Sequence, residues 1–216
     1  TGKPLTKIKE PSYFFRLSQY QEKLIQHINE NPEFIYPASH RNQILARLKK
    51  DPLQDLSISR TNFNWGIPVP EDPKHCLYVW LDALFNYYTG PPKEFWPANI
   101  HVIGKDIVWF HSVIWPSLLL GMNLDLPKQI LVHQFVTADD GRKMSKSLGN
   151  VVDFNKLFHK YPVSSFRYYL LKELSWESDL RFSEQRLEMA HDTELADKFG
   201  NLVNRVFSLS RKYNQD

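Results

Sequence analysis

The residues best suited to bind a polyphosphate lie between two glycines, in the stretch 141–150, which reads GRKMSKSLGN. The ammonium groups of Lys143 and Lys146 supply point charges to phosphates, and the hydroxyls of Ser145 and Ser147 add hydrogen-bond donors. Such a loop suits negative charge that builds up on a phosphate in a transition state. The alternative interpretation is a solvated basic loop, which fits most Lys- and Ser-rich loops of arbitrary sequence.

A second candidate is Gly104-Lys105-Asp106, which follows the apolar run 100–103. The carboxylate of Asp106 can accept hydrogen bonds from both hydroxyls of a ribose. An N-cap at the start of the next helix is an equally good interpretation of Asp106, and the two roles are compatible.

Two aromatic segments offer an apolar pocket. Ile107, His111 and Trp115 are spaced i, i+4 and i+8, so they share one face of a helix. If a helix begins near Trp80, then that residue shares a face with Ala83, Leu84 and Tyr87. The two aromatic residues of this face, Trp80 and Tyr87, would then lie on either side of a slot for a narrow side chain. For both segments, ordinary core packing is the commoner explanation of such a pattern.

The elements that must position these residues are read from periodicity. We predict helices over residues 11–30, 39–50, 107–120, 164–174 and 183–211, and buried strands over 76–79, 100–103 and 129–132. The strand-helix-strand order from 100 to 132 predicts parallel pairing with a helical crossover, hence an α/β fold. Ligands of such sheets bind beyond the carboxyl ends of the strands, which would bring Trp80, Gly104 and the residues after His133 to one rim.

Composition excludes several classes of protein. The 216 residues carry a formal charge of +3, with one cysteine, Cys76. A single thiol makes neither an internal disulfide nor a Cys-rich zinc site, so we expect a reducing compartment and no metal ligands in this chain. No apolar run is long enough to span a membrane, and no apolar leader follows Thr1.

Together these stretches resemble the methionyl-tRNA synthetases, a family of class I aminoacyl-tRNA synthetases. KMSKS at 143–147 matches the class I signature loop. The segments HVIGKDIVWFHSVIWPSLL at 101–119 and YVWLDALFNYYTG at 78–90 match the methionine-specific members, as do PSYFFRLSQYQ at 11–21, DLSISR at 55–60 and WGIPVP at 65–70. The pentapeptide alone indicates only class I, and the tryptophan-rich segments select methionine.

The resemblance implies a role for each matching position. The methionine side chain would lie among Trp80, Ala83, Leu84, Tyr87, Ile107, His111 and Trp115. ATP would be bound by Gly104, Asp106, His133, Val136, Lys143, Met144, Ser145, Lys146 and Ser147. Lys143, Lys146 and Arg60 would act in catalysis, with Lys146 on the transition-state charge. Gln134 departs from the family, which usually has glycine there.

The implied fold is the second half of a Rossmann-like nucleotide-binding fold, followed by a mainly helical stem-contact region and the start of an α-helical anticodon-binding bundle. We expect the end of a connective insertion and the return to the catalytic core at 1–57, and the second half of the Rossmann-like domain at 58–136. The KMSKS loop and stem-contact region would follow at 137–190, and the start of the helical anticodon-binding domain at 191–216. Met activation with ATP and Mg²⁺ would be followed by transfer to the 3′ end of tRNA(Met).

The sequence lacks the family's other signature, a His-Ile-Gly-His tetrapeptide. We therefore expect the N-terminal half of the catalytic domain as a necessary partner, any structural zinc outside this chain, and little activity from the chain alone. Two alternatives remain open: another class I synthetase, such as a leucyl or cysteinyl enzyme, and a truncated RNA-binding paralogue without activity. The expected location is the cytoplasm, with the mitochondrial matrix as the alternative.

Overall fold

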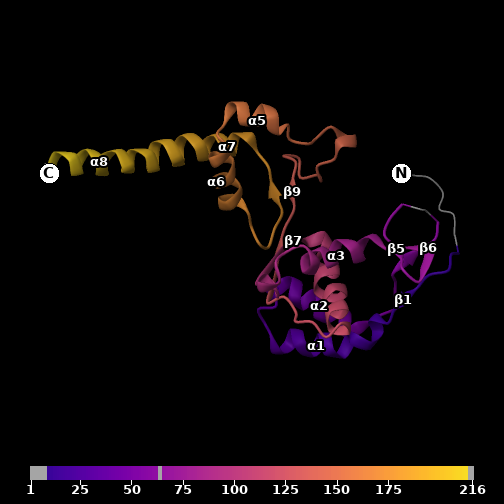
Figure 1. The fold of residues 1–216 in the computed structure, drawn as a ribbon. Coiled ribbons are helices and arrows are strands. Elements are labelled where there is room, and N and C mark those ends of the chain that lie inside the picture. Colours follow the sequence, from indigo (N-terminus) through magenta and orange to yellow (C-terminus); the bar gives the residue numbers. More distant parts are fainter. Residues whose placement is uncertain (1–8, 63–64, 214–216) are drawn as a thin grey trace. The chain divides into compact units, whose positions relative to one another are not determined.

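The computed structural model describes residues 9–62 and 65–213. The prediction about a leader after Thr1 concerns residues that lie outside the described ranges. The chain divides into two compact units, one ending at His133 and the other beginning at Gln134, and we describe each by itself (Figure 1). Within the described ranges, every helix is too short or too polar to cross a membrane.

The first unit mixes short strands with helices. Its strands are β1 (Phe14–Phe15), β2 (Ile35–Tyr36), β3 (Leu56–Ser57), β4 (Ser59–Arg60), β5 (Pro68–Val69), β6 (Asp72–Leu77), β7 (Ile100–Gly104) and β8 (Gln129–His133). Its α-helices are α1 (Gln21–Glu30), α2 (Ala38–Lys50), α3 (Val79–Thr89) and α4 (Trp115–Gly121). Its 3-10 helices are η1 (Leu17–Tyr20), η2 (Lys93–Phe95) and η3 (Lys105–Ile107), and η4 (Phe110–Ile114) is a π-helical turn.

A parallel sheet in the order β2-β8-β7 forms the centre of the first unit. Strand β7 pairs with β8 from Ile100 opposite Gln129 to Gly104 opposite His133. The parallel pairing with a helical crossover, predicted from the apolar runs, is therefore confirmed. The third strand, β2, escaped prediction because it pairs through only two residues, which lie almost a hundred positions away in the sequence.

The predicted strand 76–79 is partly wrong. Strand β6 ends at Leu77, and it pairs antiparallel with β4 and β5 in a separate sheet. The short connection between β5 and β6 favours local hairpin pairing, because closing a short loop costs little entropy. The carboxyl end of a parallel strand therefore does not position Trp80, which instead lies in the first turn of α3.

Two predicted helices are also shorter or less regular than their periodicity suggests. Residues 11–20 are not α-helical, because Phe14 and Phe15 pair with β3 and α1 begins only at Gln21. The predicted helix over 107–120 is divided into η3, a wide π turn (η4) and α4. Pro116 has no N–H to donate to the Ser112 carbonyl, which interrupts the regular helical ladder at this point.

The hydrophobic core of the first unit lies between its sheet and its helices. Helices α1 and α2 bury Leu24, Ile28, Ile44 and Leu48, while Ile130 and Val132 contribute from β8. Burial of these side chains supplies the free energy that holds β7, β8 and α3 in fixed positions. Trp80, Tyr87 and Gly104, which are predicted to bind ligands, lie on these elements.

The second unit is mainly helical. Its elements are the strands β9 (Val136–Thr137) and β10 (Leu180–Arg181), the turn η5 (Lys146–Leu148), and the helices α5 (Phe154–Lys160), α6 (Val163–Glu173), α7 (Glu184–Met189), η6 (Ala190–Gly200) and α8 (Asn201–Tyr213). Strands β9 and β10 pair in parallel. The predicted helix at 164–174 is confirmed as α6, and the long one from 183 is confirmed as α7, a π-helical segment and α8.

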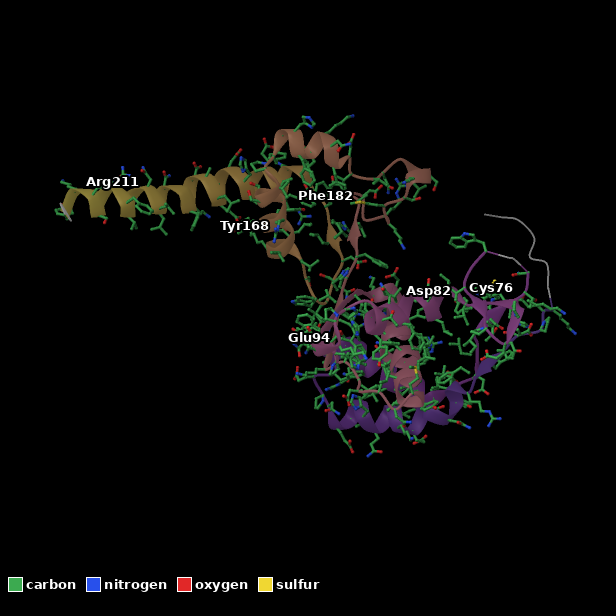
Figure 2. The ribbon with its side chains drawn as sticks, viewed as in Figure 1. Cys76, Asp82, Glu94, Tyr168, Phe182 and Arg211 are labelled. Carbon is green, nitrogen blue, oxygen red and sulfur yellow. The ribbon has the colours of Figure 1, made fainter. Side chains whose placement is uncertain are left out.

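Helix α8 extends beyond the small core of the second unit, and all its side chains are exposed, including the labelled Arg211 (Figure 2). Leu202, Val206 and Leu209 recur on it at helical spacing, and each is more than half exposed. The core of this unit lies instead around Tyr169, Phe182 and Leu187.

Candidate nucleotide and amino-acid site

The loop 138–150 is held in shape by its own hydrogen bonds. Asn150 holds the first half of the signature stretch, since its Oδ1 accepts from the Ser145 N–H at 2.8 Å and its Nδ2 donates to the Lys143 carbonyl at 3.2 Å. The hydroxyls of Ser145 and Ser147 bond to each other at 2.7 Å. Gly149 follows with a positive φ of 64°, which glycine adopts without strain. No role was predicted for Asn150, although a side-chain amide after a turn commonly binds the backbone of that turn.

The three cations of this loop differ in what they contact. Arg142 is bound to Asp140 through two of its nitrogens, each at 2.7 Å, and this pairing holds the pKa of the Asp140 carboxyl below its usual range. The Lys143 ammonium lies over the Phe135 ring, 4.9 Å from its centroid. Lys146 has neither an ion pair nor a ring contact among the described residues. Lys146 is therefore the cation with its charge most available to a phosphate.

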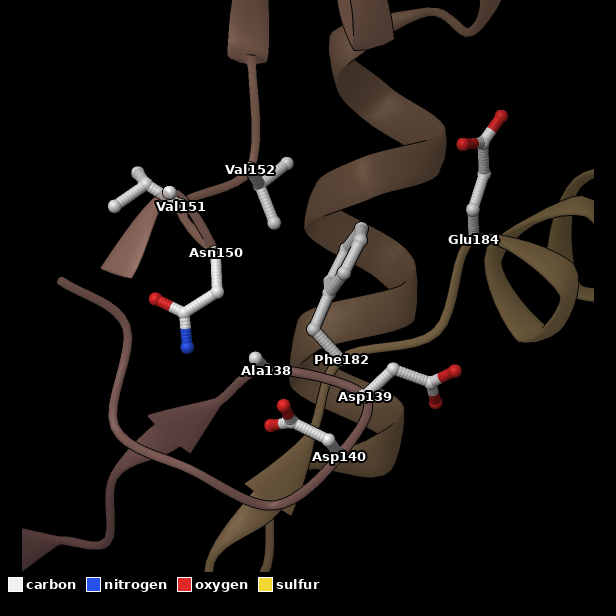
Figure 3. A pocket seen from close by; sticks show the side chains of 9 residues that line it. Ala138, Asp139, Asp140, Asn150, Val151, Val152, Phe182 and Glu184 are labelled. Carbon is white, nitrogen blue, oxygen red and sulfur yellow. The ribbon is translucent and has the colours of Figure 1, made fainter. Parts of the chain in front are cut away.

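A cavity of about 600 Å³ lies beside this loop, within the second unit. Figure 3 shows three carboxylates around it, those of Asp139, Asp140 and Glu184. Its other walls include Phe182 and Val152. Carboxylates repel a polyphosphate, so the chemistry of this cavity does not suit the nucleotide phosphates, and the lysines of the loop remain the better candidates.

In the first unit, Gly104, Asp106 and His133 lie together at the carboxyl ends of β7 and β8. A Cβ added to Gly104 would lie 2.9 Å from Asp106 Oδ1 and 3.6 Å from His133 Cε1. The absence of a Cβ at Gly104 thus lets the Asp106 carboxylate lie close to the strand end in its present position. Asp106 lies inside the turn η3, whose cap residue is Gly104, so the N-cap interpretation of Asp106 is wrong.

The two aromatic segments pack against each other. Trp80 of α3 stacks on Phe110 of η4 with ring centroids 3.8 Å apart, and meets the edge of His111 at 6.5 Å. Tyr87 lies 6.2 Å from Trp115, centroid to centroid. The helix predicted near Trp80 is confirmed as α3, and it brings Trp80 and Tyr87 to the same cluster as His111 and Trp115.

Two hydrogen bonds determine which ring nitrogen of His111 carries the proton. Its Nδ1 lies 3.0 Å from the Ile107 carbonyl, which can only accept, so Nδ1 carries the proton. Its Nε2 lies 3.0 Å from the Tyr87 hydroxyl and accepts from it. Burial lowers the pKa of His111 and raises that of Tyr87, so both groups stay neutral at pH 7.

Replacing Tyr87 by phenylalanine should leave His111 Nε2 without its donor. An unsatisfied buried acceptor costs about 1–3 kcal/mol, so we expect a free energy of unfolding lower by that amount in urea titrations. Tyr88→Phe is the matched control, because that ring packs on Trp96 in the same helix and its hydroxyl has no hydrogen bond among those described. Equal stability of the two variants would contradict the assigned hydrogen bonds.

The remaining predicted residues of this cluster differ in exposure. Leu84 and Trp115 are fully buried, whereas Ala83 is exposed. Trp115 contacts Phe85 and Trp96 as well as Tyr87, so it also belongs to the core. The core-packing explanation of this residue is therefore confirmed, and its role in a methionine pocket stays a prediction.

His101, on β7, has no predicted role, yet it lies inside the cluster. Its ring centroid is 4.4 Å from that of Tyr87 and 6.1 Å from that of His111, and its side chain is buried. Burial, with a smaller contribution from repulsion by His111, lowers the pKa of His101 from 6.5 to about 4. Its position on an alternating strand, between exposed Ile100 and Val102, was the only available signal of burial.

The depressed pKa of His101 predicts a loss of stability in acid. Between pH 6.5 and 4 the unfolded chain binds a proton that the folded chain does not, so stability is full above pH 6.5 and falls as the pH drops toward 4. A difference of this size corresponds to roughly 3 kcal/mol. Urea unfolding at pH 7 and pH 5 should show a smaller acid loss in His101→Phe, whereas His159→Gln, at an exposed histidine, should behave as the parent.

Arg60 is engaged by neighbouring groups. Its Nη1 donates to Ser57 Oγ at 2.6 Å and to the Ser59 carbonyl at 2.7 Å, and its Nε lies 3.7 Å from Glu10 Oε1. The guanidinium also lies over the Tyr78 ring. A catalytic role of Arg60 stays a prediction, and it would require some of these contacts to be exchanged for contacts with a ligand.

At the start of the second unit, Val136 begins β9 opposite Leu180 and is about one-third exposed. Gln134, which departs from the family pattern, is buried, and its Nε2 donates to the Trp176 carbonyl at 3.0 Å. The longer side chain is thus accommodated by a hydrogen bond across this unit.

A family model and individual relatives of known name place this chain in the same family. The family model described as tRNA synthetases class I (M) matches residues 1–207. A methionine–tRNA ligase of Rhizobium meliloti (strain 1021) is 48% identical over 96% of this chain and 42% of its own length. One of Bacillus subtilis (strain 168) is 44% identical over 99% of this chain and 33% of its own length.

Solved structures agree. The crystal structure of Mycobacterium tuberculosis methionyl-tRNA synthetase bound by methionyl-adenylate is 43% identical, with a TM-score of 0.89 over all of this chain and 44% of the other. The apo form from the same organism gives a TM-score of 0.84 at 40% identity, again over all of this chain and 43% of the other. The chain thus spans less than half the length of these relatives.

Proposed function

We propose that this chain, which belongs to the family of class I tRNA synthetases described as (M), has one function. It supplies the second half of the catalytic centre of a methionine–tRNA ligase. The single observation that carries this proposal is the cluster in which Trp80, Tyr87, His111 and Trp115 meet. Neutral aromatic groups of this kind suit an uncharged, polarizable thioether. The nearby Gly104, Asp106 and His133 suit a ribose held at the strand ends.

The proposed reaction has two steps. An oxygen of the methionine carboxylate attacks the α-phosphorus of ATP, the bond from that phosphorus to the bridging oxygen breaks, and pyrophosphate leaves with methionyl-adenylate formed. A hydroxyl of the 3′-terminal adenosine of the tRNA then attacks the methionyl carbonyl and loses its proton, and AMP leaves. Positioning and electrostatic stabilisation suffice for both steps.

Each group of this chain has a defined task in the first step. We assign the ribose hydroxyls to Asp106 and the charge that develops on the leaving pyrophosphate to Lys146, with Lys143 and the serines of the loop binding the remaining phosphate oxygens. Val136 would contact adenine. His111, kept neutral by burial, would orient the Tyr87 hydroxyl group near the amino-acid side chain without introducing a charge.

The proposed reaction also implies a metal ion and specific partners. Among the described residues no three His, Cys, Asp or Glu side chains lie close enough to hold a metal ion, so Mg²⁺ would enter with the nucleotide phosphates. A structural zinc would have to be bound outside these residues. The proposed partners are tRNA(Met) and L-methionine, in the cytoplasm or the mitochondrial matrix.

The proposal is tested by methionine-dependent exchange of pyrophosphate into ATP, measured on the complete protein that carries this sequence. We expect exchange with methionine and at least tenfold less with leucine or cysteine. Greater exchange with leucine or cysteine would instead assign the chain to another class I synthetase, the alternative that shares the same loop. Absence of exchange with all three would favour the non-enzymatic RNA-binding alternative.

The 216-residue chain alone should show less than about 1% of the exchange rate of the complete protein, because it lacks the His-Ile-Gly-His tetrapeptide of the family. Among described strands, β7 has an unpaired edge, which offers backbone groups to a further strand. Adding the segment with the tetrapeptide as a separate polypeptide should restore part of the activity. Full exchange by the chain alone would refute this division of the site.

A further inference from the structure

A second cavity, of about 320 Å³, lies in the first unit and contains none of the residues assigned to methionine or ATP. Its apolar lining includes Leu17, Leu56 and Ile114, together with the ring of Trp109. Its polar lining includes two charged side chains, Arg47 and Asp51. A volume at the low end of the range for small-molecule sites suits a ligand of amino-acid size better than a nucleotide.

Two side chains of the neighbouring helices hold the wall of this cavity. The amide of Gln21 donates to the carbonyls of Leu48 and Asp51, at 2.6 and 3.3 Å, and accepts from the Leu53 N–H at 2.6 Å. Both the backbone N–H and the hydroxyl of Ser18 donate to Asp55. The segment 51–55 is therefore fixed at both ends, so the cavity is preformed and would need little reorganisation to accept a ligand.

The two charges of the cavity are close but not paired. Asp51 follows the last residue of α2, and its backbone N–H donates to the Arg47 carbonyl at 3.1 Å, so the two residues lie close together at this helix end. Neither forms an ion pair with any residue of the described ranges. The Arg47 guanidinium instead stacks on Trp109, 3.8 Å from the ring centroid. This contact fixes the cation at the mouth while leaving its N–H groups available to an anion.

We propose that this cavity is a second, non-catalytic binding site for a free α-amino acid with an apolar side chain. The α-carboxylate binds the guanidinium of Arg47, and the α-ammonium binds the carboxylate of Asp51. The side chain of the ligand lies on Leu17, Leu56 and Ile114. An opposite pair of charges beside an apolar floor matches a zwitterion with an apolar substituent, and matches a simple fatty anion or an amine only in part.

The test uses calorimetry on the complete protein with three probes of the same ring. L-Phenylalanine carries both charges, 3-phenylpropanoate lacks the ammonium, and 2-phenylethylamine lacks the carboxylate. We expect each analogue to bind about tenfold more weakly than L-phenylalanine, a difference that corresponds to one lost charged contact. Binding should also weaken with added NaCl, because both charges lie at an exposed mouth.

Two isosteric or near-isosteric variants separate the contacts. Asp51→Asn should weaken the binding of L-phenylalanine and 2-phenylethylamine about tenfold and leave the binding of 3-phenylpropanoate unchanged. Arg47→Gln should weaken the binding of L-phenylalanine and 3-phenylpropanoate about tenfold and leave that of 2-phenylethylamine unchanged. Lys50→Gln, at the same helix end but outside the lining, is the matched control and should change none of them. Failure of L-phenylalanine to bind at millimolar concentration, or binding that both variants leave intact, would overturn the proposal.

The outcome is independent of the proposed function. Neither Arg47 nor Asp51 belongs to the proposed catalytic centre, so both variants should keep the pyrophosphate exchange of the parent protein at saturating methionine. A protein that exchanges pyrophosphate but does not bind L-phenylalanine would contradict only the second site. A protein that binds L-phenylalanine but fails to exchange would contradict only the proposed reaction.

Discussion

Replacing Lys146 by alanine in the complete protein is expected to slow adenylate formation by about 10²–10³-fold, the effect of removing one preorganised group from a developing negative charge. Lys146 is the cation of its loop with neither an ion pair nor a ring contact among the described residues, and Asn150 holds the backbone of Lys143 and Ser145 just before it. The affinity for methionine should hardly change, because the charge arises only as pyrophosphate leaves. Single-turnover formation of the adenylate measures the effect.

Arg142→Gln is the matched control for this result. Arg142 is a cation of the same loop, but Asp140 already neutralises it. We expect it to change the rate by less than about threefold, the effect of an exposed ion pair. Lys146→Arg should recover part of the rate, since it restores the charge but not the geometry of an ammonium. If Lys146→Ala weakened methionine binding while the rate held, the loop would bind the ground state and the assignment would be wrong.

Trp115→Ala should be the most destabilising single change in the first unit, by about 3–5 kcal/mol, because truncating a fully buried tryptophan leaves a large cavity. Its ring contacts Phe85, Tyr87 and Trp96, so three aromatic neighbours would lose a packing surface. Urea unfolding of the complete protein measures the loss. The same substitution at Trp65, which is 90% exposed, is the control and should have little effect on stability.

Trp115→Phe separates the role of this residue in the core from its role in the pocket. Phenylalanine keeps most of the apolar area, and it removes an indole N–H that is buried without a partner, which offsets part of the lost packing. We expect a folded variant with a methionine KM raised about tenfold and a nearly unchanged KM for ATP. An unchanged KM for methionine would leave Trp115 as a core residue alone.

Several features of this molecule follow from local sequence. The glycines and lysines of 141–150 specify a loop that can surround phosphates, and the spacing of Trp80 and Tyr87 specifies one helical face, which α3 presents as expected. The apolar runs on either side of residues 107–120 specify β7 and β8. Each of these signals involves neighbours within about one or two turns of chain, where periodicity is informative.

The tertiary structure decided the features that depend on distant partners. The Tyr87 hydroxyl meets His111 across 24 positions, and the two-residue strand β2 meets β8 across almost a hundred, so no local pattern indicates either contact. The burial of His101 likewise follows from the elements packed over β7. The sequence therefore determined which residue types are present and in what local order. Only long-range packing decided which of them share a site, because side-chain contacts and protonation depend on neighbours that the chain supplies from far away.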